Sequence, residues 1–180
     1  MHGLGLLFEA APDWSDGLER SETERTAPAH ADTRRLLDFW YAHERSPVIG
    51  THLPSRAIGR LLPNLAVFDY RAVRNEFRVR LAGLGLVRRF GRDISHHYLS
   101  EVVSAEDHER LHATLMSARD VKLPQIREVK IHGTRRTLLH YEMIGLRVIA
   151  ADKETPLVLG GFFFFDRNRP VRADNQHRRT

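Results

Sequence analysis

The sequence predicts an α+β domain built on an antiparallel sheet of about five strands. Strand-like segments are grouped before and after a run of short helices, without the strand–helix–strand alternation that is typical of a parallel sheet. Polar turns join neighbouring strand segments, which favours hairpins. Phenylalanine fills positions 162–165, and four in a row predict a strand buried on both faces. We therefore expect short helices on one face and, on the other, either the N-terminal helix or another subunit.

The composition is that of a globular domain, with 42% hydrophobic and 28% charged residues in a chain of 180. The longest nearly unbroken apolar run, 157–165, is far shorter than the roughly 20 residues that a membrane helix needs. No signal-peptide pattern opens the sequence. Cysteine is absent, which excludes disulfides, thiolate metal sites, cysteine nucleophiles and cysteine-linked chromophores. We expect a cytoplasmic protein without a membrane partner.

The net charge of +5 raises the hypothesis of an arginine-rich nucleic-acid-binding protein. Of the 28 basic residues three are lysine and 25 are arginine, a bias that a genome-wide codon preference explains as easily as a binding surface. The arginine doublets are dispersed along the chain rather than gathered into a stripe, at 34–35, 88–89 and 135–136. Nucleic-acid binding is therefore kept as an alternative and not as the main prediction.

The chain divides into four predicted parts. Residues 1–30 hold six acidic and two basic residues and are interrupted by prolines, which is typical of a flexible acidic tail. Residues 31–63 are expected to form an N-terminal helical cap, and residues 64–166 the core domain. Residues 167–180 carry five arginines and one aspartate and are predicted to be a basic C-terminal tail.

The cap begins with a helix predicted over 32–45, with Asp32 as its N-cap and Ser46-Pro47 at its end. Its apolar stripe is assigned to the cap and to a dimer interface, and consists of Leu36, Leu37, Trp40 and Tyr41. A second helical stretch runs from Leu53 to Pro63.

Two-residue alternation then predicts strands over 65–70 and 77–81, joined by a polar turn. Short helices are expected around 84–90 and 98–103. Ser104 and Asp107 have the spacing of a capping box and open the most clearly defined helix of the sequence. Three further strands follow over 121–131, 136–148 and 157–165, and the last two are joined by a polar turn at 151–156.

One motif suggests metal chemistry. The segment from His108 to His112 reads H-E-x-x-H, which on a helix places two histidines on one face for Zn²⁺ and offers Glu109 as a general base. A catalytic zinc needs a third protein ligand, and the candidates Glu128, His132 and His140 lie on predicted strands rather than on a second helix. A zinc-dependent hydrolase is therefore kept as an alternative. Because no other catalytic pattern is present, we predict a protein without enzymatic activity.

The order and spacing of several segments resemble those of a PAS domain, and specifically of short bacterial PAS-like proteins, over about residues 34–166. The segments that carry the resemblance are 36–40, 60–65, 77–83, 90–93, 98–99, 104–107 and 159–162. The resemblance implies a five-stranded antiparallel sheet over a small cavity under short helices, with an N-terminal helix on the outer face. It also implies a sensory or partner-binding module in bacterial signalling that dimerises and whose output passes through a partner protein.

By position in this pattern, eight residues are expected to bound the pocket: Leu81, Leu86, Phe90, Tyr98, Leu111, Leu115, Tyr141 and Met143. Without cysteine the chain cannot form a flavin–thiol adduct. The sequence does not indicate another cofactor, and the cofactor is left unknown. Haem-binding PAS domains use a histidine on or near the long helix, which makes His108 and His112 candidate axial ligands. We expect a homodimer, an unidentified signalling partner and a small molecule as ligand.

Overall fold

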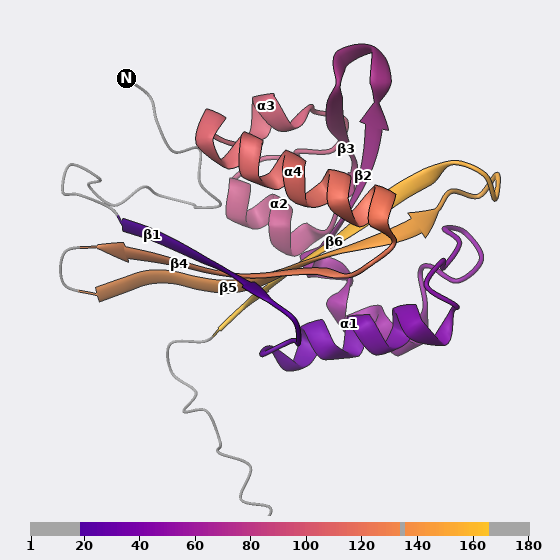
Figure 1. Ribbon diagram of the computed structural model, residues 1–180, viewed down its shortest axis with the longest axis horizontal. Coiled ribbons are helices and arrows are strands. Elements are labelled where there is room, and N and C mark those ends of the chain that lie inside the picture. The colour runs from indigo at the N-terminus through magenta and orange to yellow at the C-terminus, as the bar shows by residue number, and fades with distance from the viewer. Residues whose placement is uncertain (1–18, 134–135, 166–180) are drawn as a thin grey trace, which may run out of the picture.

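A computed structural model describes residues 19–133 and 136–165, and its helices lie on both faces of one sheet (Figure 1). The elements, in chain order, are β1 (Glu19–Arg25), α1 (Ala31–Ala42), the 3₁₀ helix η1 (Arg56–Asn64), β2 (Leu65–Arg71), the 3₁₀ turn η2 (Ala72–Arg74), β3 (Glu76–Ala82), α2 (Leu84–Phe90), α3 (Leu99–Val102), α4 (Ala105–Val121), β4 (Gln125–Gly133), β5 (Arg136–Ile149) and β6 (Pro156–Phe164). Within these ranges, no helix is both long enough and apolar enough to span a membrane.

The sheet is antiparallel throughout and has six strands, in the order β1-β4-β5-β6-β2-β3. The α+β class and the antiparallel sheet are confirmed, but the expected number of strands is too low by one. The additional strand is β1, which pairs with β4 from Glu19 opposite His132 to Arg25 opposite Ile126. Residues 19–25 were expected to belong to a flexible acidic tail. Residues 1–18 and the predicted basic tail at 167–180 lie outside the described ranges.

Two hydrophobic cores lie on opposite faces of this sheet. The pocket-side core lies beneath α2, α3 and α4 and includes Phe68, Phe77, Leu99, Leu115 and Phe162. The cap-side core lies beneath α1 and η1 and includes Leu36, Trp40, Ile58, Leu61 and Phe163. The adjacent phenylalanines 162 and 163 therefore point to opposite faces, as the strand period requires. The cover over the second face is the N-terminal helix of the same chain.

Local capping explains where the two longest helices begin. The Ser104 hydroxyl accepts a hydrogen bond of 3.2 Å from the Asp107 backbone N–H, as the sequence predicted for α4. Helix α1 spans Ala31–Ala42 rather than the predicted 32–45, and its N-cap is His30, two residues before the predicted Asp32. The His30 Nδ1 atom accepts the hydrogen bond from the Asp32 backbone N–H at 3.0 Å. The Asp32 side chain instead pairs with Arg60 of η1 at 2.6 Å.

A buried carboxylate fixes the entry of the chain into α1. Glu142 on β5 is fully buried and accepts hydrogen bonds from the backbone N–H groups of Ala29, at 2.7 Å, and His30, at 2.8 Å. A buried carboxylate without such donors is strongly unfavourable. At the other end of the helix, the Trp40 indole N–H donates to the Arg147 carbonyl at 2.7 Å. Helix α1 is thus attached to β5 at both ends.

The glycine pair of β6 makes room for the aromatic rings on both faces. A Cβ atom at Gly160 would lie 2.7 Å from the Phe68 ring, and one at Gly161 would lie 2.7 Å from the Phe163 ring. At Gly161 the Leu36 side chain of α1 would also be only 2.9 Å away. Distances this short require the neighbouring side chains to move. The close approach of α1 to the sheet therefore depends on Gly161.

We predict that Gly161→Ala destabilises the fold by about 1–3 kcal/mol, since the added methyl group overpacks the cap-side core. The matched control is Gly59→Ala in η1, where a Cβ atom meets no other atom within 4 Å and no loss of stability is expected. Urea unfolding of both variants measures the difference. Equal stabilities for the two variants would contradict the packing described for α1.

Candidate ligand-binding cavity

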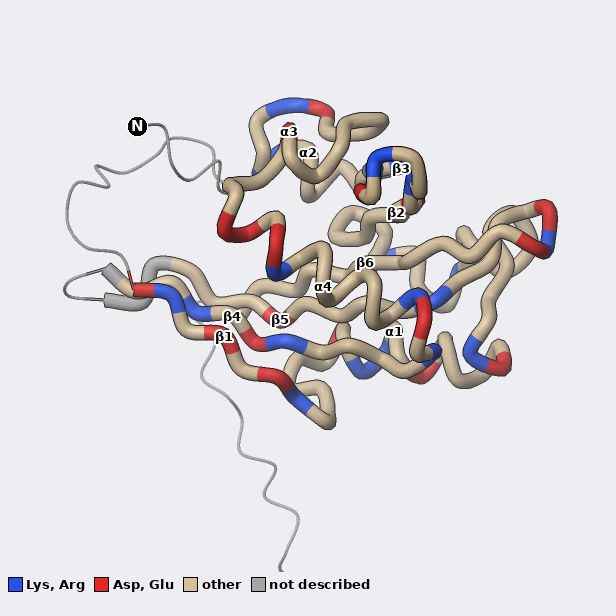
Figure 2. The backbone as a smooth tube through the Cα atoms, turned by 45° about the horizontal axis from the view of Figure 1, so that its top comes forward, with Lys and Arg blue, Asp and Glu red and all other residues tan. Residues whose placement is uncertain are grey.

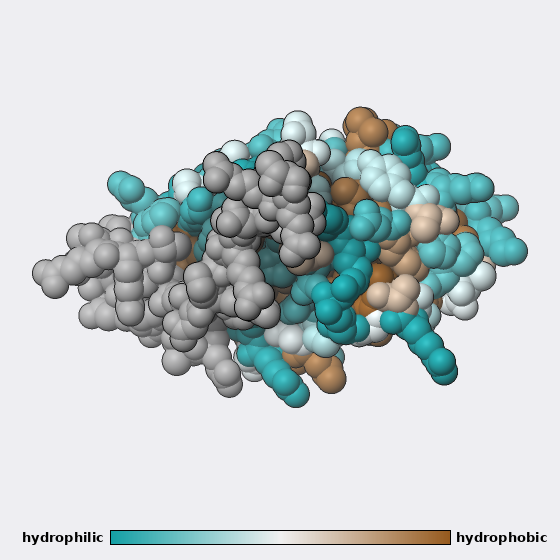
Figure 3. Space-filling model, turned by 90° about the horizontal axis from the view of Figure 1, so that it is seen from below, coloured by the Kyte–Doolittle hydropathy of each residue, from teal (hydrophilic) through white to brown (hydrophobic). Residues whose placement is uncertain are grey.

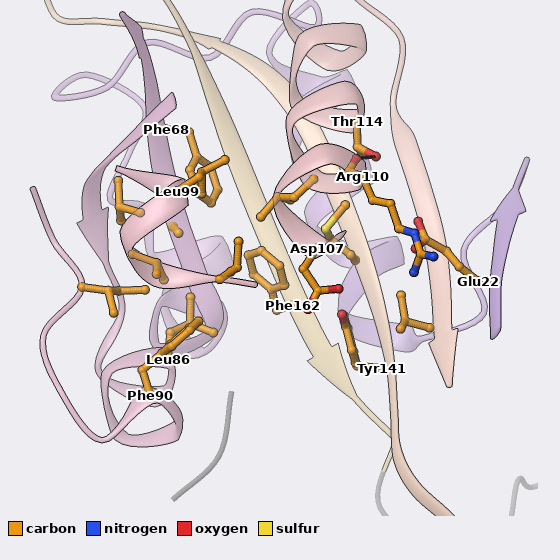
Figure 4. A pocket seen from close by; sticks show the side chains of 18 of the residues that line it. Glu22, Phe68, Leu86, Phe90, Leu99, Asp107, Arg110, Thr114, Tyr141 and Phe162 are labelled. Carbon is orange, nitrogen blue, oxygen red and sulfur yellow. Dashed lines mark hydrogen bonds between the residues drawn. The ribbon is translucent and has the colours of Figure 1, made fainter. Parts of the chain in front are cut away.

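A cavity of about 70 Å³ lies inside the pocket-side core, between the sheet and helices α2, α3 and α4 (Figure 4). Every strand contributes to its wall. The lining residues are Arg20, Glu22, Ala66, Phe68, Val79, Leu86, Phe90, Ile94, Leu99, Val102, Val103, Asp107, Arg110, Leu111, Thr114, Val129, Tyr141, Met143 and Phe162. An engineered apolar cavity of roughly 150 Å³ holds benzene. The cavity therefore has room for a smaller group, of about three or four carbon atoms.

The cavity has an apolar part and a polar end. The apolar part is formed by aliphatic and aromatic side chains from β2, β6, α2 and α3, among them Phe68, Leu99 and Phe162. The polar end lies where β1 faces α4, and there the cavity is lined by Arg20, Glu22, Asp107, Arg110 and Thr114. An apolar wall with a few convergent polar groups is typical of small-molecule sites.

Ion pairs across the polar end connect β1 to α4. The Arg20 guanidinium binds the Asp107 carboxylate in the first turn of α4 and also pairs with Glu22 at 3.2 Å. On β4, the strand next to β1, the Arg127 Nε atom donates to the Thr114 hydroxyl of α4 at 2.9 Å. The edge strand β1 thus contributes charged groups to the cavity wall that the other strands do not supply.

The Tyr141 side chain on β5 extends into the same end of the cavity (Figure 4). Its exposed fraction is 6%. Burial raises the pKa of the Tyr141 hydroxyl above its ordinary value of 10.0, whereas the Arg20 guanidinium acts in the opposite direction. The hydroxyl therefore stays protonated at neutral pH and remains a hydrogen-bond donor.

Five of the eight residues predicted to bound the pocket line this cavity: Leu86, Phe90, Leu111, Tyr141 and Met143. Leu115 is buried one helical turn farther along α4, in the pocket-side core but outside the cavity wall. Tyr98 is half-buried at the start of α3, and its ring lies 4.0 Å below the guanidinium of Arg74. Neither residue contacts the cavity.

Leu81 lies on the surface and is 63% exposed, although strand alternation predicted an inward position. The pairing of β3 with β2 is irregular here: Val79 lies opposite Phe68 and Leu81 opposite Val67, so Arg80 is an additional residue. Such a bulge reverses the alternation beyond it. Leu81 therefore points away from the cavity that Val79 lines.

The cap residues have two different environments. Leu36 and Trp40 are fully buried against the sheet, whereas Leu37 is half-buried beside the cap-side core. Tyr41 is 48% exposed. Within this chain the first two residues therefore hold the cap in place, and only Leu37 and Tyr41 are available at the outer surface.

The histidine motif on α4 does not assemble a metal site. The rings of His108 and His112 lie 5.8 Å apart, and His112 Nε2 lies 3.1 Å from the carbonyl oxygen of Asn75. Among residues 19–133 and 136–165, no group of three histidine or carboxylate side chains is arranged to hold a metal ion. The zinc-hydrolase hypothesis therefore lacks its third ligand in this part of the chain.

The haem hypothesis does not fit the cavity either. Neither His108 nor His112 lines it, so neither is placed as an axial ligand. Pockets for drug-sized ligands span roughly 300–1,000 Å³, and the cavity, at about 70 Å³, is far smaller. A porphyrin therefore does not fit a cavity of this size.

The sequence analysis missed the charged residues of the polar end, above all Arg20 and Glu22. The sequence did contain a signal for them. Arg20 and Glu22 are two residues apart, so in a strand their side chains lie on the same face. Charged side chains dominate β1, however, and its composition resembles that of a solvated tail. Figure 2 shows basic and acidic residues interspersed along the neighbouring elements β1, β4 and α4.

An antiparallel sheet that encloses a cavity beneath short helices, with an N-terminal helix on its other face, is the arrangement of a PAS-type module. A family model described as PAS domain matches residues 29–163, and the chain belongs to this family. No curated protein and no solved structure is significantly similar to it. Strand β1 precedes the matched range, so Arg20 and Glu22 are contributed from outside it.

We predict that Tyr141 releases its proton above pH 10. Because the folded chain keeps this proton where the unfolded chain loses it, the free energy of unfolding falls as the pH rises through this range. Ultraviolet titration of tyrosinate in the wild type and in Tyr141→Phe isolates the contribution of this residue among four tyrosines. The difference between the two titration curves is the absorbance step of Tyr141. If this step is centred at or below pH 10, the Tyr141 hydroxyl is not buried as described.

Proposed function

We propose that the protein is a non-catalytic sensory module of bacterial signalling in the cytoplasm, and that it binds a small molecule in the cavity of its PAS domain. The observation that carries the proposal is the cavity itself, about 70 Å³ of largely apolar space inside an otherwise packed core. Protein interiors contain few voids larger than a water molecule, and each costs stability. A retained cavity is therefore favoured as a binding site over a packing defect.

The signal would pass from the cavity to α1 through β6. Phe162 lines the cavity, and the next residue, Phe163, is buried beneath α1 together with Leu36. A ligand that displaces the Phe162 ring changes the backbone position of both residues, because they are consecutive in one strand. A ligand that binds one packing of α1 more tightly than another shifts the population of the two states by that difference in affinity.

The output would be read at the outer surface of the cap, where we also propose that the homodimer forms. The exposed Tyr41 and the half-buried Leu37 provide apolar area on α1. Figure 3, seen from the α1 side, shows apolar residues at the surface among hydrophilic ones. An unidentified signalling protein would bind this surface. No specific observation favours nucleic acid as the partner, since charges of both signs are interspersed along β1, β4 and α4.

We predict that filling the cavity abolishes binding of a small neutral probe. Ala66 lines the cavity and is 2% exposed, so Ala66→Leu places three additional carbon atoms in it. In amide NMR titrations with 1-butanol, the wild type is expected to show saturable shifts in β6, α3, α4 and α1. Ala66→Leu should weaken binding by about tenfold or more, because burial of the added apolar group competes directly with the probe.

The matched control is Ala57→Leu, at an exposed position of η1 on the opposite face. It should bind 1-butanol as the wild type does. Ala66→Val adds fewer carbon atoms to the cavity and replaces Ala66→Leu in the test if the leucine variant does not fold. Unchanged binding in a folded Ala66 variant would overturn the cavity as the binding site, and shifts that never reach α1 would overturn the proposed route of the signal.

A further inference from the structure

A groove on the surface between β1 and α4 adjoins the polar end of the cavity. Arg20, Glu22 and Arg110 line both the cavity and the groove, and Ala113 and Arg127 complete the groove. Figure 4 shows Arg110 extending from α4 on the same side of the cavity as Glu22 of β1. The cavity and the groove therefore adjoin each other and share the walls formed by these three residues, with the apolar surface on the inner side and the charged surface on the outer side.

The charged end has more cationic than anionic groups. Three guanidinium groups, from Arg20, Arg110 and Arg127, line the groove, whereas Glu22 is its single carboxylate. Asp107, which lines the cavity nearby, is bound by Arg20. Among the lining residues the guanidinium groups therefore outnumber the carboxylates by one, and the further carboxylates near Arg110 and Arg127 belong to Glu106 and Glu24, which do not line the site.

The guanidinium groups also have incompletely used donors. The carboxylate oxygen nearest to Arg127 belongs to Glu22 and lies 3.6 Å from the Nε atom of Arg127, and the next belongs to Glu24 and lies 4.0 Å from its Nη2 atom. Arg110 pairs with Glu106 at 2.6 Å. The side chains of Glu24 and Glu106 are each 70% exposed, so water and salt screen them. The Nε atom of Arg20 is buried and has no hydrogen-bond partner.

We propose that this site binds a small amphipathic monocarboxylate, with the carboxylate on Arg110 and Arg127 in the groove and a short apolar chain in the cavity. The proposal rests on the proposed function, because it assumes that the cavity holds a ligand. Guanidinium groups bind carboxylates in paired, charge-assisted hydrogen bonds. The excess of one positive charge among the lining residues favours a ligand with one negative charge over a dianion. A cavity of about 70 Å³ sets the size of the apolar chain to about three or four carbon atoms.

The proposal is tested with butyrate, 1-butanol and butylammonium, which share an apolar chain but carry a negative, no and a positive charge. Amide NMR titrations of the full chain at pH 7 and constant ionic strength give the three affinities. Butyrate is expected to bind about tenfold more tightly than 1-butanol, because a hydrogen bond to a charged group contributes about 1.5–3 kcal/mol. Butylammonium is expected to bind more weakly than 1-butanol.

Two variants locate the carboxylate. In Arg127→Gln and in Arg110→Gln, butyrate affinity is expected to fall about tenfold whereas 1-butanol affinity stays unchanged. Arg56→Gln is the matched control, an exposed arginine of η1 on the opposite face of the sheet, and should leave both affinities unchanged. Arg110 is exposed on α4, so Arg110→Gln is expected to fold normally. The test can therefore be made with this variant even if Arg127→Gln does not fold.

Three outcomes would overturn the proposal. If 1-butanol binds and butyrate binds no more tightly, the charged end does not recognise a carboxylate, although the cavity remains a binding site. If the arginine variants weaken butyrate and 1-butanol equally, the arginines act on the cavity and not on the head group. If neither probe binds, the carboxylate site and the proposed function are both contradicted.

Discussion

The whole structure depends on one constraint, that the middle of the sheet must be covered on both faces. Phe162 and Phe163 are consecutive on β6, so their rings enter opposite cores, and neither core can be left open to water without a large hydrophobic penalty. The glycines before them allow the covering side chains to approach closely. The position of α1, its attachment through Glu142 and Trp40, and the enclosure of the cavity all follow from this requirement.

The two faces of the sheet are covered in different ways. On the cap side, α1 is joined to β5 at both ends and leaves a dense core. On the pocket side, the short helices α2 and α3, the long helix α4 and the charged strand β1 enclose a space that side chains do not fill. A ligand in that space contacts the inner face of β6, and the cap packs on its outer face. In the proposed function, a single strand would therefore separate the bound ligand from the cap that provides the output.

Much of the fold follows from the sequence, because alternation, capping and turn composition act locally. The Ser104 cap, the hairpins and the phenylalanine strand were all predictable in this way. Strand β1 was not, since its charged sequence forms a strand only beside the edge of β4. The bulge at Arg80 turns Leu81 away from the cavity wall. This bulge could not be predicted, because it arises from the pairing of β3 with β2. The polar end of the cavity combines residues from β1 and α4, about 90 positions apart, and no local pattern relates them.

The most direct test of this account is a crystal structure of the protein under xenon pressure, because xenon enters dry apolar cavities. The account predicts one xenon atom within the pocket-side core, among Phe68, Leu99 and Phe162, with the backbone of the sheet unchanged. A pocket-side core without xenon, filled instead by repacked side chains, would show that the two-sided cover leaves no ligand space and would contradict the account.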